Sequence, residues 1–280
     1  MQKSLNFADH ARESAGLVYV YPVVSRRSGG VSLGINLNPN NACNWRCIYC
    51  QVPDLSLGSA PKIDLQLLEN ELSGFLQELL HGKFMEERVP EGLRRINDIA
   101  ISGNGEPTSA ARFAEIVELV GSVMKHSGLS EDTRLVLITN GSLMHRKGVQ
   151  AGIARMAESN GEVWFKLDSA TCEGRKRIND TTETPGHVFS NLSACSSLCP
   201  TWIQTCVFET DGTPPSQEEC DAYVEFLAPL ASDLAGVLLY GLARKSLQPG
   251  GERLSPVSRE WMDSFAKRIE AAGLAVKMFL

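Results

Sequence analysis

Hydrophobic runs alternate with amphipathic patterns from residue 32 to the end of the chain. Six runs predict strands at residues 32–37, 98–102, 134–139, 162–167, 201–208 and 236–242, and a short last strand is expected at 274–279. Between them, residues 63–80, 111–125 and 216–231 carry apolar side chains three and four positions apart, which is typical of helices. This alternation indicates βα units and a parallel sheet.

Polar segments follow the predicted strands. The first strand precedes a cysteine-rich segment, the second precedes GNGEPT (103–108), the third ends in TNGS (139–142), and the fourth ends in KLDS (166–169). A doubly wound sheet and an open barrel both accommodate six βα units. The polar segments favour the barrel, because barrel chemistry lies at the carboxyl ends of the strands. We therefore expect an α/β fold, a partial (β/α)6 TIM-type barrel, over residues 32–280, with residues 1–31 as an N-terminal extension packed on it.

Hydropathy and charge indicate the cellular location and the class of partner. No run approaches the ~18 apolar residues of a membrane span, and the N-terminus lacks the apolar region of a signal peptide. We expect a cytoplasmic protein with no membrane association. The chain has 33 acidic and 27 basic residues, a net charge of −6. This balance argues against bulk tRNA as a partner, because polyanion binding normally requires a basic surface.

Three of the eight cysteines, Cys43, Cys47 and Cys50, occupy the segment CNWRCIYC at the spacing C-x3-C-x2-C. Disulfides are disfavoured in a reducing cytoplasm, and the clustering favours a metal site. Structural zinc sites usually add a second pair of ligands, and none follows nearby. A [4Fe-4S] cluster with three cysteines leaves one iron open for another ligand. A zinc site completed from afar, or three buried thiols, are the alternatives.

The segment resembles the signature of the radical S-adenosylmethionine (SAM) enzymes, with Tyr49 at the aromatic position before the last cysteine. The segments PVVSRRSGGVSLGINLNPNNACNWRCIYC, ISGNGEPT, LITNGSL and YGLAR resemble the subfamily of iron-sulfur oxidoreductases related to tRNA wyosine synthases. The resemblance implies a partial barrel in which Cys43, Cys47 and Cys50 ligate one [4Fe-4S] cluster and perform its catalytic role. It also implies SAM on the fourth iron and its cleavage to a 5′-deoxyadenosyl radical.

The resemblance, together with the places of polar residues and glycines at the predicted strands and their carboxyl ends, gives the residues expected to contact the cofactors. They are Tyr49, Gly103, Gly105, Glu106, Asn140, Lys166, Asp168, Ser169, Gln204 and Tyr240. The glycines leave room beside the cluster, and Glu106 can accept a hydrogen bond from an ammonium group. Asn104 stands where the family usually has glycine. The alternative interpretations are a turn at residues 105–107, a helix cap in TNGS, and a helix cap at Asp168 or Ser169.

Other residues have weaker signals. Cys195, Cys199 and Cys206 have a spacing conceivable for a second cluster, but buried free cysteines are common. The pairs Arg26–Arg27 and Arg244–Lys245 are candidates for an anionic group of a substrate. The basic run at residues 175–177 is either a polyanion site or a solvated face.

We expect a small-molecule or peptide substrate and a reductant such as flavodoxin or ferredoxin. The alternative functions are a wyosine-type tRNA-modifying enzyme, a glycyl-radical-enzyme activase and a non-catalytic iron-sulfur protein.

Overall fold

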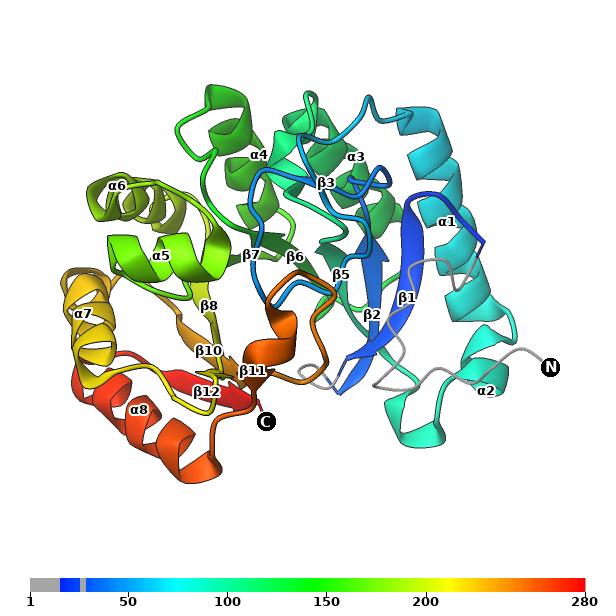
Figure 1. Cartoon of the computed structure of the whole chain (residues 1–280). Helices are drawn as coiled ribbons and strands as arrows, with labels where there is room; N and C mark the ends of the chain where they lie inside the picture. The colour runs from blue at the N-terminus through cyan, green and yellow to red at the C-terminus, as the bar shows by residue number, and fades with distance from the viewer. Residues whose placement is uncertain (1–15, 26–28, 280) are drawn as a thin grey trace.

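A computed structural model describes residues 16–25 and 29–279 (Figure 1). The candidate substrate residues Arg26 and Arg27 lie outside the described residues.

One curled sheet forms the centre of the molecule, and its strands follow the order β1-β2-β5-β6-β7-β8-β10-β12. The bounds are β1 (Val20–Ser25), β2 (Gly30–Ile35), β5 (Ile96–Ile101), β6 (Arg134–Thr139), β7 (Gly161–Lys166), β8 (Thr201–Val207), β10 (Gly236–Gly241) and β12 (Val276–Phe279). Within this sheet β2, β5, β6, β7, β8, β10 and β12 are parallel to one another, and β1 pairs antiparallel with β2. The predicted partial barrel is confirmed, and each predicted strand is found within two residues of its expected ends.

Helices cover the outer side of the curled sheet (Figure 1). They are α1 (Leu65–His81), α2 (Phe84–Arg88), α3 (Phe113–His126), α4 (Lys147–Ala157), α5 (Cys172–Asn179), α6 (Pro185–Ser196), α7 (Gln217–Leu227) and α8 (Arg259–Ala271). Four short strands lie in the connections: β3 (Ala42–Cys43), β4 (Ser56–Leu57), β9 (Glu209–Thr210) and β11 (Leu254–Ser255). Side-chain caps fix several helix starts, as at α7, where Ser216 and Glu219 form a capping box.

Apolar side chains fill the space between the sheet and the helices. Leu33, Ile99, Leu137, Phe165 and Ile203 lie in the main core and are fully buried. Successive side chains of a strand point to opposite faces, so these residues share the face of the sheet that the helices cover. The opposite face is left for polar residues near the carboxyl ends of the strands. We call this end of the barrel its mouth.

The described part of the N-terminal extension joins the sheet as its edge strand, β1. The buried carboxylate of Glu71 in α1 accepts hydrogen bonds from the amides of Val18, Tyr19 and Val20 at 2.8, 2.8 and 3.3 Å. These bonds satisfy amides where the chain enters the strand. The division of the chain at residues 31 and 32 stays a prediction.

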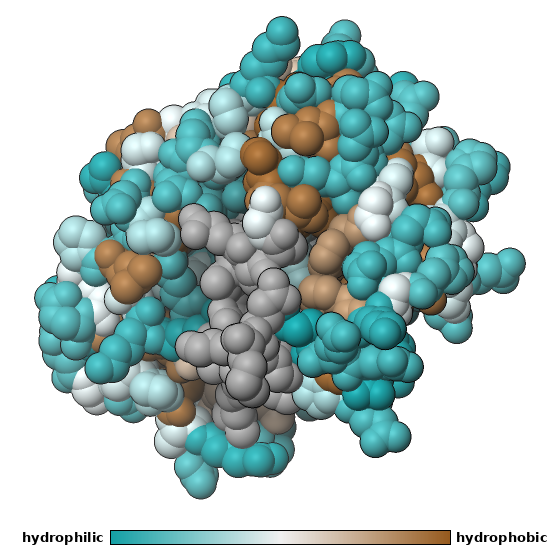
Figure 2. Space-filling view, turned by 90° about the vertical axis from the view of Figure 1, so that its right-hand side faces the viewer, coloured by the Kyte–Doolittle hydropathy of each residue, from teal (hydrophilic) through white to brown (hydrophobic). Residues whose placement is uncertain are grey.

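The side of the molecule at α1 and α2 is mostly hydrophilic, with separate hydrophobic patches (Figure 2). Among residues 16–25 and 29–279, no helix has the length and apolar character needed to cross a membrane.

Candidate functional site

The three clustered cysteines lie on one segment across the mouth, residues 42–50, which we call the cysteine loop. Two backbone hydrogen bonds attach it to the end of α5: the amide of Arg46 donates to the carbonyl of Asn179 at 3.1 Å, and that of Ile48 to Ile178 at 2.8 Å. The loop follows β2, so these bonds bridge several strands of the barrel. They fix the loop over the mouth.

A second attachment comes from the segment after β10. The hydroxyl of Ser246 donates to the carbonyls of Ile48 at 2.6 Å and Cys50 at 3.1 Å, and the amide of Leu247 donates to Cys50 at 2.9 Å. The side-chain amide of Gln248 extends this attachment, because it donates to the carbonyl of Val52 at 2.7 Å. Both sides of the cysteine loop are therefore restrained.

Three cysteine side chains on one loop are the kind of ligand set that an iron-sulfur cluster uses. Burial raises the pKa of Cys43 and Cys47 to about 12 in each case, although Lys166 lowers that of Cys47. The side-chain amide of Asn179 lies 3.3 Å from the Cys47 sulfur. In the described residues, no three metal-binding side chains converge on a single ion. A cubane gives each thiolate its own iron, so its ligands need not converge on one point.

The glycines of GNGEPT allow a close approach to the cysteine loop. A Cβ atom at Gly105 would lie 2.0 Å from the carbonyl oxygen of Ala42 and 2.7 Å from the Asn38 side chain. One at Gly103 would lie 2.2 Å from the Asn36 side chain. Larger residues would push the loop after β5 away from Cys43 and from the end of β2. The predicted need for glycine at both positions thus has a steric cause, and their contact with cofactors stays a prediction.

Glu106 is buried and ties two strands together. Its Oε1 accepts from the Thr108 amide at 3.1 Å and from the Thr108 and Thr139 hydroxyls at 2.6 Å, while Oε2 accepts from the Asn140 amide at 2.7 Å. Burial raises the pKa of this carboxyl, and the donors partly offset the effect. A carboxylate oxygen accepts two hydrogen bonds readily, so Oε2 has capacity left for a ligand ammonium. That role stays a prediction.

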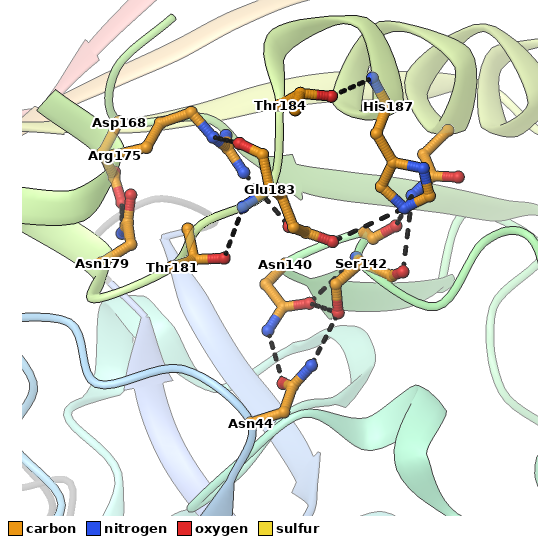
Figure 3. Close-up of polar contacts among 12 residues, drawn as sticks. Asn44, Asn140, Ser142, Asp168, Arg175, Asn179, Thr181, Glu183, Thr184 and His187 are labelled. Carbon is orange, nitrogen blue, oxygen red and sulfur yellow. Dashed lines mark hydrogen bonds and ion pairs between the residues drawn. The ribbon is translucent and has the colours of Figure 1, made fainter. Parts of the chain in front are cut away.

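The TNGS segment connects the end of β6 with the cysteine loop (Figure 3). The Asn140 amide donates to Asn44 at 2.8 Å, Asn44 donates to the Ser142 hydroxyl at 2.7 Å, and that hydroxyl donates to Asn140 at 2.7 Å. The next helix, α4, begins after Arg146. TNGS is therefore not its cap, and that alternative is wrong.

Asp168 braces the cysteine loop from the end of β7. It accepts hydrogen bonds from the Tyr49 hydroxyl at 2.5 Å, the Asn179 side chain at 2.8 Å and the Cys206 amide at 3.0 Å. The cap of α5 is Thr171, and the Ser169 hydroxyl accepts from the Thr171 amide at 3.2 Å. The helix-cap alternative for Asp168 and Ser169 is wrong, whereas their contact with SAM stays a prediction.

Lys166 lies behind the ring of Tyr49. Its ammonium is 5.1 Å from the ring centroid and 3.4 Å from the Tyr240 hydroxyl. Burial alone would lower the pKa of Lys166, but Tyr240, Asp168 and Cys47 outweigh it and raise that pKa. Gln204 is buried in β8, level with Lys166 in the strand register. The structure therefore brings the predicted residues of β7, β8 and β10 together beneath the cysteine loop.

Other predicted residues lie around or outside this group. Arg244 is half-buried and Lys245 exposed, immediately before the segment that holds Cys50. Cys195 and Cys199 belong to the main core, whereas Cys206 lies in a separate hydrophobic cluster. The spacing of these three cysteines therefore does not gather them at one site.

Arg175 was expected on the surface as part of a basic run, but it is buried. It is 1% exposed, pairs with Glu183 at 3.1 Å, and lies 5.4 Å from the ring centroid of Trp45 in the cysteine loop. Lys176 pairs with Asp180 and Arg177 with Glu219. Asn44, Asn179 and Ser246 were also missed, because isolated polar residues in loops carry no periodic signal. Arg175 thus supports the cysteine loop, whereas Lys176 and Arg177 belong to an exposed, ion-paired face.

Comparison with known proteins gives a family. The sequence model described as "Radical SAM superfamily" matches residues 37–227. The GTPase Obg of Brachyspira hyodysenteriae is 26% identical over 132 residues, 47% of this chain and 17% of that protein. The UPF0026 protein MJ1312 of Methanocaldococcus jannaschii is 29% identical over 159 residues, 56% of this chain and 42% of that protein. The chain thus spans less than half the length of these relatives.

A solved structure agrees with this fold. HydG, a maturase of the [FeFe]-hydrogenase, superposes with a TM-score of 0.57 at 11% identity, covering 89% of this chain and 50% of that chain. At this identity the likeness concerns the fold alone.

Proposed function

Because the chain belongs to the radical SAM superfamily, we propose that it binds one [4Fe-4S] cluster through Cys43, Cys47 and Cys50 and starts radical chemistry with SAM. The observation that carries the proposal is the cysteine loop itself, with three thiols restrained across the mouth of a partial barrel. When bound, the cluster and SAM supply reductive cleavage to a 5′-deoxyadenosyl radical that abstracts hydrogen from a substrate.

The chain's own groups would hold and orient these cofactors. Asp168 fixes the Tyr49 hydroxyl at 2.5 Å, and Asn140 fixes Asn44 at 2.8 Å, so both halves of the cysteine loop are positioned by strand ends. Glu106 would accept the ammonium of a bound amino acid through Oε2. Such preorganised contacts avoid the entropic cost of ordering the site on binding.

We propose a small-molecule or peptide substrate, with a flavodoxin or ferredoxin as reductant. The excess of acidic residues, 33 against 27, disfavours bulk tRNA. Arg244 and Lys245 lie beside the cysteine loop and are suited to hold an anionic substrate group. The segments ISGNGEPT, LITNGSL and YGLAR support a place near the wyosine-related branch, without tRNA as the substrate.

SAM cleavage tests the proposal. Anaerobically reconstituted protein, reduced with dithionite, should convert SAM to 5′-deoxyadenosine and methionine, measured by liquid chromatography. The Cys47→Ala variant should give only the background rate. A background rate for the parent protein would identify a non-catalytic protein instead, and an equal rate above background for Cys47→Ala would remove Cys47 from the site.

A tRNA titration tests the substrate class. We expect weak binding in a filter assay that disappears at physiological salt and does not stimulate SAM cleavage. Micromolar or tighter binding with a steep salt dependence, together with stimulated cleavage, would restore the wyosine-type alternative.

A further inference from the structure

A cavity of 540 Å³ lies at the carboxyl end of β8. Its lining residue Phe208 packs against Tyr49 of the cysteine loop, with the ring centroids 5.7 Å apart. Residues of α5, α7, α8 and the segment after β8 line the cavity, and the three helices lie at the same end of the sheet (Figure 1). Cavities of small-molecule sites commonly measure ~300–1,000 Å³. The size is therefore suited to a small organic ligand.

Aromatic side chains form the wall of this cavity. The ring centroids of Tyr223 and Phe265 are 5.4 Å apart, and those of Phe265 and Trp261 are 5.3 Å apart. Phe208 contributes a further ring. The Tyr223 hydroxyl bonds with that of Thr205 at 2.6 Å, which satisfies both polar groups. The wall therefore offers ring faces more than open hydrogen-bonding groups.

The charges around the cavity are predominantly acidic. Glu173, Glu218 and Glu219 line it, and the one basic lining residue, Arg177, is already paired with Glu219. Glu173 and Glu218 occupy the first turns of α5 and α7. Acidic residues there offset the positive ends of the helix dipoles, so these helix starts do not favour an anion. The combination favours a cation.

We propose that this cavity binds a small protonated amine with an aromatic or aliphatic body. The ammonium would lie near Glu173 and Glu218, and the body would pack against the rings, which also attract cations through their faces. Among the residues expected to contact cofactors, Asp168 and Ser169 line the cavity at its inner end. Cys43, Cys47, Cys50 and Lys166 do not line it, so the cavity lies beside the proposed cluster site, with Asp168 and Ser169 at the boundary.

Calorimetric titration of the reconstituted protein tests this site with three probes of similar size. We expect 2-phenylethylamine to bind, 2-phenylethanol to bind more weakly, and 3-phenylpropionate to bind least. The double variant Glu173→Gln/Glu218→Gln should weaken amine binding roughly fivefold and leave the alcohol unchanged. Both glutamates are exposed, so the variant should fold normally. Glu225→Gln, exposed on α7 but outside the cavity, is the matched control and should bind like the parent protein.

Three results would overturn the proposal. They are no binding of the amine, tightest binding of the carboxylate, and an equal loss of amine affinity in the control variant. Competition separates this site from the proposed function: saturating SAM should leave amine binding in place. Displacement of the amine by SAM would show that the cavity is part of the cofactor site.

Discussion

Cys43 and Cys47 in the cysteine loop and Cys195 and Cys199 in the core form two groups with similarly raised thiol pKa values but different surroundings. Burial raises the pKa of Cys43 and Cys47 in the cysteine loop to about 12, and it does the same for Cys195 and Cys199 in the core. Thiol acidity therefore does not distinguish a metal site from a structural cysteine here. What differs is position, since the first group lies at the carboxyl ends of barrel strands, where chemistry is usual.

The two groups are also held differently. Cys195 packs among core residues and lies 3.5 Å from the Thr201 hydroxyl, while the Cys199 thiol donates to the Gly161 carbonyl at 3.3 Å. The cysteine loop is held by polar contacts from separate elements, such as Asp168 to Tyr49 and Ser246 to Cys50. The core cysteines are fully buried, whereas the cysteines of the loop are only partly buried.

The largest expected effect is the loss of iron from variants of the cysteine loop, which core-cysteine variants should not show. Replacing Cys43, Cys47 or Cys50 by alanine should reduce the iron content from about four per chain to near zero, because each thiolate holds one iron of a cubane. Iron and sulfide analysis after anaerobic reconstitution measures this.

Cys195→Ala is the matched control and should retain about four irons per chain. A parent protein with about eight irons, or a Cys195→Ala variant that loses its iron, would show that the core cysteines also bind a cluster.

Glu106→Ala should produce the next largest effect. Loss of the carboxylate leaves the buried Thr108 and Asn140 amides without their acceptor. We expect the free energy of unfolding to fall by about 3 kcal/mol and SAM binding to weaken about tenfold, measured by urea unfolding and calorimetry. Glu118→Ala, on the exposed face of α3, should change neither. Unchanged SAM affinity would remove Glu106 from the site.

Arg175→Met tests the support behind the loop. Removing the guanidinium leaves Glu183 half-buried without its cation and takes away the contact with Trp45. The unfolding free energy should fall by about 2 kcal/mol, less than for a fully buried pair, because the Glu183 side chain is 19% exposed. The double variant Arg175→Met/Glu183→Gln should recover part of the loss. A single variant as stable as the parent would show that the pair does not support the loop.

The smallest expected effect concerns the amide of Asn179 beside the Cys47 sulfur. Donors to cluster sulfurs favour the reduced state, so Asn179→Leu should lower the reduction potential. The shift should be roughly 40 mV if the bond contributes about 1 kcal/mol. Potentiometry with the cluster intact measures it, with Asn70→Leu, at an exposed position of α1, as the control. A rise in potential, or the same shift in both variants, would contradict the assignment.

The sequence predicted most of the barrel because its strands are apolar and regularly spaced. Strand β1 was missed, since Pro22 interrupts the pattern. Proline is tolerated at a sheet edge, and β1 is the edge strand here. Gly34 of β2 faces this strand, and a Cβ atom there would lie 2.2 Å from the Tyr21 ring.

The supporting residues of the site were beyond sequence reasoning. Asn179 meets Cys47 across 132 positions, and Ser246 meets Ile48 across 198. Such contacts depend on how the chain closes in space and leave no local periodicity. The CNWRCIYC segment was recognisable because cluster ligands must be close in the chain for one loop to present them.

The central claim is that the cysteine loop holds a cluster with one open iron site. Electron paramagnetic resonance of the dithionite-reduced protein tests it most directly, with SAM added in steps to the parent protein and to Cys195→Ala. We predict that both spectra change and that the change saturates near one SAM per cluster. A reduced-cluster signal that stays the same at saturating SAM would contradict the claim.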